Sequence, residues 1–430
     1  MPTQLIKPMH VQRFEILCNV GDAIVANLAM NIVFFFERDL DTVVLRRAFA
    51  RALTNLPIFA ARMATGGGPM RIRCRGQGVP LTSVASERTL REAICSVWED
   101  KGSWLVDAVN GVTARWGLSP LCKVRVTHLA DDATAIGFSW HHAVGDMQTL
   151  MHFMNAWSAA ATGKVLAEPL IVADRAAYLD EHLPADGARE PGVRCLRFTE
   201  IVRGARYLAR EARKQRTLSV CFGDDEIVRM REAYGSRMRL SANDVVCAHI
   251  CEALMNADEG VARRTLAIVV NARTRCGLDP MLVGNIITTL NLELRRGEPA
   301  TSIAERIRHN VDHFADQHCD MRANQRFLDA GGRWRAARCV TAAFSPVAWN
   351  PIVTNLSSFG VYRLQFEDTF TSYCTVLMTL PVAGSATLME GAHGSGLVFR
   401  MALPLKDFQV MSAPAVREYM HRFRCSTAAS

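Results

Sequence analysis

The sequence predicts an α/β protein made of two halves of comparable size. Apolar residues occupy 49% of the 430 positions, enough for a sizeable core and for roughly two to three domains. Strand-like and helix-like patterns alternate along the chain and restart after residue 215. Between residues 167 and 191 the periodicity fades, and several prolines and glycines mark a surface crossover. We therefore expect domains at 1–180 and 216–430, joined by a crossover segment at 181–215.

The first half is expected to place a β-hairpin directly before a long helix. Asp41 suits the N-cap of an early helix, and Gly163 suits the C-cap of the long one. The first hairpin strand alternates apolar and charged residues, and Asp131-Asp132 turns it into an apolar strand that ends at Trp140. We expect strands at 31–36, 70–74, 121–129 and 134–140, and helices at 42–53 and 147–162. The glycine run before the strand at 70–74 reads as a turn and fits neither the dinucleotide nor the Walker pattern.

The second half repeats the alternation of strands and helices. Asp224 and Ser241 are expected to cap two of its helices. Strands are expected at 218–222, 266–270, 353–356, 374–380, 386–389 and 397–403, and helices at 224–235, 241–254, 303–314 and 413–422. A further helix, at 196–215, carries mostly arginine among its charged residues. Such a helix most often presents a solvated face, and contact with a phosphate or a partner is the alternative.

Composition favours a cytoplasmic protein. The thirteen cysteines are odd in number and scattered, which indicates reduced thiols rather than a disulfide framework. No apolar run reaches the roughly 18 residues of a membrane span, and no secretory signal pattern is visible at the start. We expect no membrane partner and a monomer.

Neither a metal site nor a nucleic-acid interface is expected. Cys247, His249 and Cys251 lie on one expected helix without a second ligand pair, so they read as core residues. The net charge of +8 favours anionic partners. However, the basic helix contains only two aromatic residues, Phe198 and Tyr207, and no nucleic-acid reader motif is present.

His142 is the candidate for general base. It follows the apolar strand and precedes the long helix, and such junctions often carry chemistry. A histidine titrates near neutral pH and can accept a proton from an alcohol or amine. Asp146 could hydrogen-bond the ring, brace the loop or cap the helix, and the spacing does not choose among these. No nucleophile elbow or protease-like cysteine is present, so acyl transfer would proceed by direct attack of the acceptor.

Residues 141–146, His-His-Ala-Val-Gly-Asp, resemble the HHxxxD motif of the BAHD acyltransferases. That family belongs to a superfamily with chloramphenicol acetyltransferase and the condensation domains of nonribosomal peptide synthesis. Other segments resemble the family in the same order along the chain: 18–22, 57–63, 120–140, 241–254, 270–275 and the Gly-Asn pair at 284–285.

The resemblance implies two domains like chloramphenicol acetyltransferase, each a mixed β-sheet flanked by helices, with an active-site channel between them. It implies that His142, and not His141, is the base. It also implies that Asp146 is structural and turned from the channel toward an arginine of the second half, for which Arg273 is the matching position.

Two segments depart from the family pattern. Met147 replaces the glycine that usually follows the aspartate, and residues 365–369 keep only the phenylalanine of the family's Asp-Phe-Gly-Trp-Gly motif. The second departure argues against a plant-type enzyme more than against catalysis.

The expected function is transfer of an acyl group from a thioester to a small-molecule alcohol or amine. Acyl-CoA is the favoured donor, used as a cosubstrate with no bound cofactor. Thr354 or Asn355 is expected to stabilise the oxyanion from the opposite domain. The alternative donor is the phosphopantetheine of an acyl carrier protein, as in a condensation-type enzyme. A noncatalytic binding protein on the same fold is the second alternative.

Overall fold

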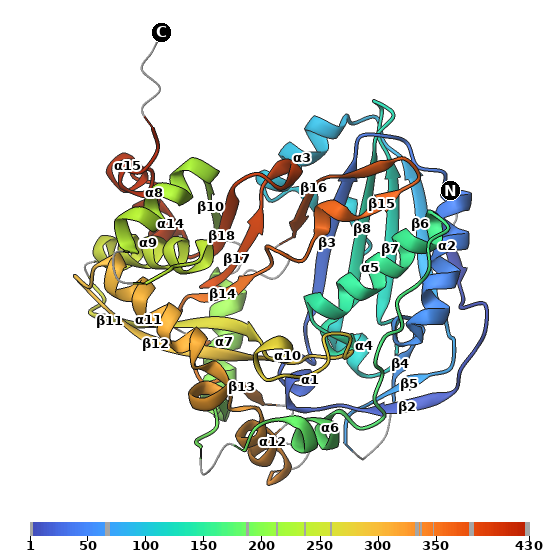
Figure 1. Ribbon diagram of the computed structural model, residues 1–430, viewed down its shortest axis with the longest axis horizontal. Helices are drawn as coiled ribbons and strands as arrows, with labels where there is room; N and C mark the ends of the chain where they lie inside the picture. The colour runs from blue at the N-terminus through green and yellow to red at the C-terminus, as the bar shows by residue number, and fades with distance from the viewer. Residues whose placement is uncertain are drawn as a thin grey trace.

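The computed structural model consists of two lobes, each built on one large mixed β-sheet (Figure 1). It describes residues 3–64, 69–185, 189–211, 214–235, 238–258, 260–331, 335, 338–346, 348–377 and 382–425. Two smaller sheets accompany the large ones. The fold is therefore α/β with two sheet-based units, as the sequence predicts.

The first sheet has seven strands and carries the strand that leads to His142. Its order is β1 (Gln4–Ile6), β6 (Val79–Ala85), β7 (Cys122–His128), β8 (Thr134–His141), β3 (Ala29–Phe36), β16 (Thr369–Val376) and β15 (Gln365–Phe366). β6 and β7 pair in parallel, and the other pairs are antiparallel. The expected hairpin is confirmed, since β7 and β8 pair along their whole length.

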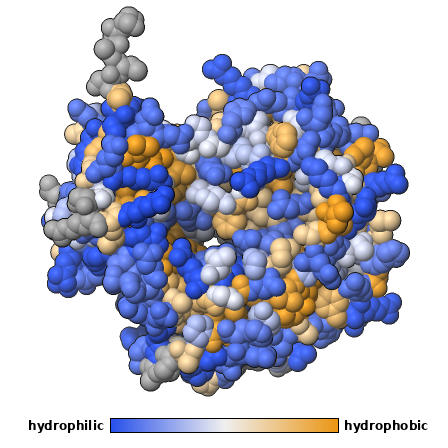
Figure 2. Space-filling view, viewed as in Figure 1, coloured by the Kyte–Doolittle hydropathy of each residue, from blue (hydrophilic) through white to orange (hydrophobic). Residues whose placement is uncertain are grey.

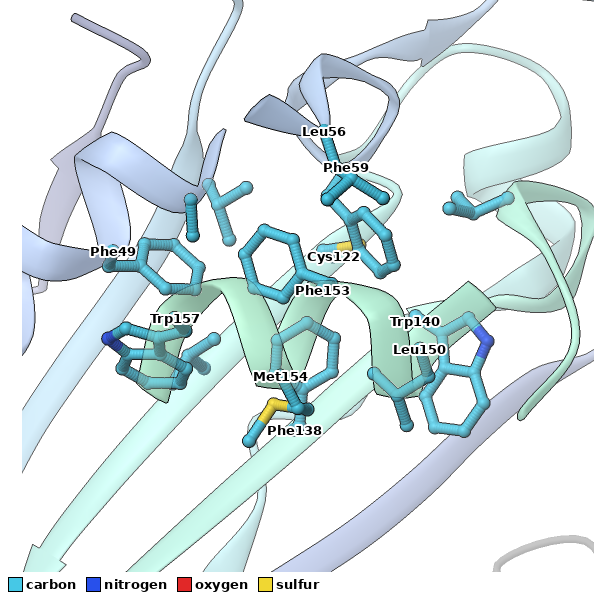
Figure 3. Packing of buried hydrophobic residues seen from close by; sticks show 14 of the residues in the cluster. Phe49, Leu56, Phe59, Cys122, Phe138, Trp140, Leu150, Phe153, Met154 and Trp157 are labelled. Carbon is cyan, nitrogen blue, oxygen red and sulfur yellow. The ribbon is translucent and has the colours of Figure 1, made fainter. Parts of the chain in front are cut away.

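Helix α5 (Met147–Ala161) lies on this sheet beside α2 (Thr42–Asn55) and forms the main core of the first lobe. Asp41 caps α2 by accepting from the backbone N–H of Val43, as expected. Phe153 packs against Phe59 with ring centroids 4.3 Å apart, and against Phe138 at 5.6 Å (Figure 3). This aromatic packing holds the middle of α5 against the first sheet, and the loop that carries His142 leads directly into this helix.

The second sheet has six strands and faces a separate hydrophobic core. Its order is β10 (Arg216–Phe222), β18 (Leu397–Leu403), β17 (Ser385–Glu390), β14 (Ile352–Asn355), β11 (Arg263–Asn271) and β12 (Ile287–Arg295). β14 runs parallel to both of its neighbours. The core between this sheet and its helices contains α8 (Asp224–Tyr234), α9 (Ala242–Ala257), α11 (Ala300–Asp312), α14 (Leu405–Met411) and α15 (Pro414–Met420).

The chain crosses between the lobes more than once. β15 and β16 lie inside 216–430, the range expected for the second domain, yet β16 pairs with β3 of the first sheet. The two sheets therefore do not separate at 181–215, and the expected domain division stays a prediction. Pairing between segments more than 300 residues apart leaves no trace in local periodicity.

Several elements were not expected from the sequence. They include β12, α3 (Leu90–Trp98), α12 (Met321–Asp329) and α6 (Arg175–His182), which lies where the periodicity fades. The expected basic helix is α7 (Phe198–Glu211), and its start is displaced by β9 (Val193–Cys195), which pairs with β13 (Cys339–Thr341). Asp224 is the first residue of α8 and not its cap, which is Gly223.

The remaining elements are short. They are β2 (Phe14–Leu17), α1 (Val20–Ile24), β4 (Arg62–Met63), β5 (Arg71–Cys74), α4 (Gly111–Arg115), α10 (Ala272–Arg275) and the turns η1 (Pro57–Ala60), η2 (Gly102–Leu105), η3 (His142–Val144), η5 (Phe314–His318), η6 (Val361–Arg363) and η7 (Ala392–Gly394). The glycines at 66–68, Arg213 and the end of the strand expected at 374–380 lie outside the described residues. Within the described ranges, no helix combines the length and apolarity that a membrane span needs.

Candidate active site

His142 lies where strand β8 ends and the chain turns toward α5. The strand pairs as far as His141, which faces Ala29 of β3, and η3 then carries His142 away from the sheet. The side chain of His142 is half-buried. Its position between a rigid strand and a packed helix gives the ring a fixed support.

Asn285, from the second half of the chain, holds the ring of His142. The Oδ1 atom of Asn285 lies 2.9 Å from Nδ1 of His142. The Nδ2 group of Asn285 donates to Oδ1 of Asp22 at 2.8 Å and to the carbonyl oxygen of His142 at 2.7 Å. Because both of these partners only accept, the amide of Asn285 must present its oxygen to the imidazole.

This contact selects one tautomer of His142. Nδ1 must carry the proton that it donates to Asn285, so the lone pair of the neutral ring lies on Nε2. Burial lowers the pKa of His142 below its ordinary value, although Asp146, Asn285 and Asp22 oppose that shift. The ring is therefore neutral at pH 7 with Nε2 able to accept a proton.

His141 has the opposite character. Its Nε2 donates to the carbonyl oxygen of Ala26 at 3.0 Å, and its Nδ1 accepts from the backbone N–H of Ala143 at 3.2 Å. The residue is fully buried, and burial lowers its pKa to about 4. Both ring nitrogens are engaged in structural hydrogen bonds, which leaves His142 as the one histidine of the pair with a free nitrogen.

A buried ion pair between Asp22 and Arg175 supports His142 from behind. Nη1 of Arg175 lies 2.9 Å from both carboxylate oxygens of Asp22, and the two side chains are almost completely buried. Arg175 also donates to the carbonyl oxygens of Ala143 and Val144, in the turn after His142. The pair thus braces both the amide of Asn285 and the loop that carries His142.

Sequence reasoning missed this network in part. Asp22 and Asn285 belong to segments that resemble the family, but neither was given a role at the site. Arg175 lies in the stretch without periodicity, and nothing in the local sequence marks it as buried. Contacts over 150 residues join it to Asp22, and only the folded chain shows them.

Asp146 points away from the ring of His142 and toward Arg273. Its carboxylate accepts from Arg273 at 2.7 and 3.1 Å, and from the backbone N–H groups of Thr149 and Ile286. Asp146 is also the N-cap of α5. Burial raises the pKa of Asp146, but the charge and hydrogen bonds of Arg273 outweigh it, so the pKa lies below its ordinary value.

Arg273 in turn ties the second half of the chain to this loop. It is fully buried and donates to the carbonyl oxygens of Leu282 and Gly284 and to Oδ1 of Asn271. The aspartate and the arginine therefore hold together α5 of the first lobe and the segment before β12, where Asn285 lies. Met147, the residue after the aspartate, is buried in the first core, and nothing in the structure explains why it replaces glycine.

We expect Gly145→Ala to destabilise the loop that carries His142. A Cβ atom at Gly145 would lie 2.5 Å from Cβ of Thr149. Thr149 cannot yield, because its hydroxyl accepts from Gly284 N–H and donates to the Gly284 carbonyl oxygen. Overpacking of this kind costs about 1–3 kcal/mol. Urea unfolding measures the loss, and Gly223→Ala is the control, since its Cβ would meet open space. Equal stability of both variants would contradict the tight packing.

Thr354 and Asn355 lie at the end of β14, in the second sheet. Nδ2 of Asn355 donates to Asn243, and its Oδ1 accepts from the backbone N–H and the hydroxyl of Ser357. Asn355 therefore also secures the turn after β14. The hydroxyl of Thr354 has no hydrogen-bond partner among the described residues. The expected contact of Thr354 or Asn355 with an oxyanion stays a prediction.

The segment that replaces the family's Asp-Phe-Gly-Trp-Gly motif is structural. Its one retained residue, Phe366, is fully buried and packs edge-on against Phe36 and Trp157, at 5.5 and 5.1 Å between ring centroids. This contact anchors β15 on the first lobe. The loss of the other motif residues therefore does not touch the contacts of His142.

Cys247, His249 and Cys251 are core residues of α9, as the sequence predicts. His249 uses both ring nitrogens, toward the hydroxyl of Tyr234 and the carbonyl oxygen of Met420. In the part of the chain that the structure describes, no group of three or more histidine, cysteine or acidic side chains could hold a metal ion.

The surface is hollowed between the two lobes (Figure 2).

Comparisons with known proteins agree with this architecture. The family model described as Transferase family matches residues 3–368. A hydroxycinnamoyltransferase from Narcissus pseudonarcissus is 26% identical over 178 residues, which cover 39% of this chain and 40% of that protein. The matched region thus spans less than half of this curated relative.

Two solved structures share the fold at low sequence identity. Vinorine synthase superposes with a TM-score of 0.72 at 16% identity, over 95% of both chains. TRI101 of F. sporotrichioides, in complex with coenzyme A and T-2, superposes with a TM-score of 0.74 at 11% identity, over 94% of this chain and 98% of that one. With the family model covering most of its length, this chain belongs to the transferase family of BAHD acyltransferases.

Proposed function

We propose that this protein transfers an acyl group from acyl-CoA to an alcohol or amine acceptor, with His142 as general base. The observation that carries the proposal is the contact between Asn285 and His142, which leaves Nε2 unprotonated. Family membership supports the reaction class. The coenzyme A in the similar TRI101 structure supports the donor.

The reaction would proceed by direct attack on the thioester. Nε2 of His142 takes the proton from the acceptor hydroxyl or amine as that atom bonds to the carbonyl carbon. The tetrahedral intermediate carries a negative oxygen, which Thr354 or Asn355 would stabilise. The carbon–sulfur bond then breaks, and the protonated Nε2 returns its proton to the leaving thiolate. The products are the ester or amide and free CoA.

The donor test compares acetyl-CoA with an acetylated carrier protein, using hexan-1-ol and hexylamine as acceptors. Release of free CoA thiol by the wild type, and its loss in His142→Gln, is the expected result. Release of the carrier's thiol, without release of CoA thiol, would instead indicate a condensation-type enzyme. The exposed Arg203, Arg206 and Arg210 of α7 would suit either the phosphates of CoA or an acidic carrier. Binding of acetyl-CoA, with no release of free thiol in any of these assays, would indicate a noncatalytic binding protein.

The pH dependence of kcat/KM should show an acid limb below pH 6.5. The pKa of His142 is lowered by burial, so the base loses activity only when the pH falls through that lowered value. The rate should therefore rise with pH, with the midpoint of the rise below pH 6.5. We expect the measurement with acetyl-CoA and hexan-1-ol between pH 4.5 and 8 to show this. An acid limb centred above pH 7 would contradict the neutral imidazole.

A further inference from the structure

One row of side chains crosses the whole second sheet from β12 to β10. Residues that pair across neighbouring strands lie about 4.8 Å apart and point to the same face. The register links Thr289 to Val269, Val269 to Thr354, Thr354 to Thr387, Thr387 to Arg400 and Arg400 to Ser219. Five of these six residues are polar, which is unusual for the largely buried face of a sheet.

This face is turned toward the first lobe. Arg400 is 3% exposed, and its guanidinium donates to Asp100 and to the carbonyl oxygens of Val97 and Val376. Asp100 and Val97 belong to the first lobe, and Val376 ends β16 of the first sheet. The neighbouring positions of the same strands, such as Leu290 and Val353, point the other way into the second core. The row therefore borders the space between the lobes.

Three hydroxyl groups of the row have no hydrogen-bond partner in the described chain. Thr289 and Thr387 are only 9% and 7% exposed, and Thr354 is half-buried. None of the three hydroxyl groups makes a hydrogen bond within the described residues. Their oxygen atoms are also not among the unpaired polar atoms that solvent cannot reach. By contrast, Arg400 donates to the hydroxyl of Ser219 at the far end of the row. A nearly buried hydroxyl is stable only with a partner, so these groups are suited to meet one from the interlobe space.

The row lies close enough to His142 for one bound substrate to contact both. Thr289 follows Asn285 by four residues, which span at most about 13 Å, and Asn285 contacts His142. Thr387 lies one strand from Thr354, and Thr289 lies two strands from it on the other side. The two outer threonines would therefore meet the body of a substrate rather than its reacting atom.

We propose that Thr289 and Thr387 bind hydrogen-bonding groups of the acceptor, and that the acceptor carries hydroxyl or amide groups besides the one that is acylated. This inference rests on the proposed function. A site that offers hydroxyl groups to a substrate discriminates against analogues that lack the matching group, because its own polar groups are then left unpaired. Long-chain alkanols without a second polar group would be poor acceptors.

The test compares hexan-1-ol with hexane-1,6-diol, each with acetyl-CoA as donor. For the wild type we expect kcat/KM to be about tenfold higher for the diol. Thr289→Val and Thr387→Val keep the branched shape that suits a strand and remove only the hydroxyl. The double variant should lose the advantage of the diol, with unchanged kcat/KM for hexan-1-ol and unchanged KM for acetyl-CoA. Thr217→Val, on edge strand β10 outside the row, is the matched control and should retain the preference.

Each other outcome overturns the inference. Equal rates for the two alcohols in the wild type would show that the row does not select polar acceptors, and this comparison needs no folded variant. A raised KM for acetyl-CoA in the double variant would assign the row to the pantetheine arm instead. Wild-type release of CoA without a preference for the diol sinks this inference alone. Absence of any His142-dependent CoA release sinks the proposed function.

Discussion

His142→Gln should lower kcat for acyl transfer by about 10²- to 10⁴-fold, the contribution of a well-placed general base. Glutamine retains a polar side chain that can still hydrogen-bond Asn285, but it has no nitrogen that accepts a proton near neutral pH. Because the ring contributes to proton transfer more than to binding, KM for acetyl-CoA should change little. Release of CoA thiol, followed at saturating acceptor, measures the loss.

The matched control is His309→Gln, at an exposed histidine on α11. It should keep wild-type turnover. Circular dichroism and urea unfolding should show that both variants are folded. Turnover of His142→Gln within a factor of three of the wild type would remove His142 from the mechanism.

Arg273→Met is expected to destabilise the protein by about 3–5 kcal/mol at pH 7, because it leaves the buried carboxylate of Asp146 without its cation. Both side chains are nearly inaccessible, at 1% and 5% exposure, so water cannot replace the lost partner. The variant should also lose activity, since Arg273 holds the carbonyl oxygen of Gly284 next to Asn285. Urea unfolding of wild type and variant measures the difference.

The pH dependence of this loss gives a second check. The pKa of Asp146 is lowered in the folded protein, so its contribution to stability is present above the unfolded value of about 4 and disappears as the pH falls further. The difference between wild type and Arg273→Met should therefore shrink in acid. Arg295→Met, which breaks an exposed pair with Glu293, is the control and should change stability little. A pH-independent difference would contradict the assigned charge pair.

The β8–α5 junction could be predicted from the sequence because both signals are local. An apolar run gives way to helical spacing within ten residues of His142, and Asp146 is a favoured N-cap residue. Pairing of β16 with β3 could not be predicted, since a strand pattern does not specify its partner. The same limit explains why one domain boundary does not describe the two sheets.

In the site, too, some residues could be predicted from the sequence and others could not. His142 and Asp146 stand out within one short motif, and the resemblance to the family directs Asp146 toward Arg273. Three choices for Asp146 were open from spacing, and the folded chain combines two of them: it caps α5 and braces the loop. Asn285 and Arg175 contact His142 and its loop across more than 30 residues of chain, so their positions depend on tertiary contacts that no local pattern encodes.

If Asn285 fixes the tautomer of His142, the protonation of the two ring nitrogens must show it. Long-range ¹H–¹⁵N spectra of protein labelled at histidine, with His142→Gln to assign the signals, report this at pH 7.5. We expect a neutral ring with the proton on Nδ1 and a free Nε2, and loss of that preference in Asn285→Leu. A ring protonated at Nε2 in the wild type would contradict it, because the nitrogen assigned to take the acceptor's proton would already carry one.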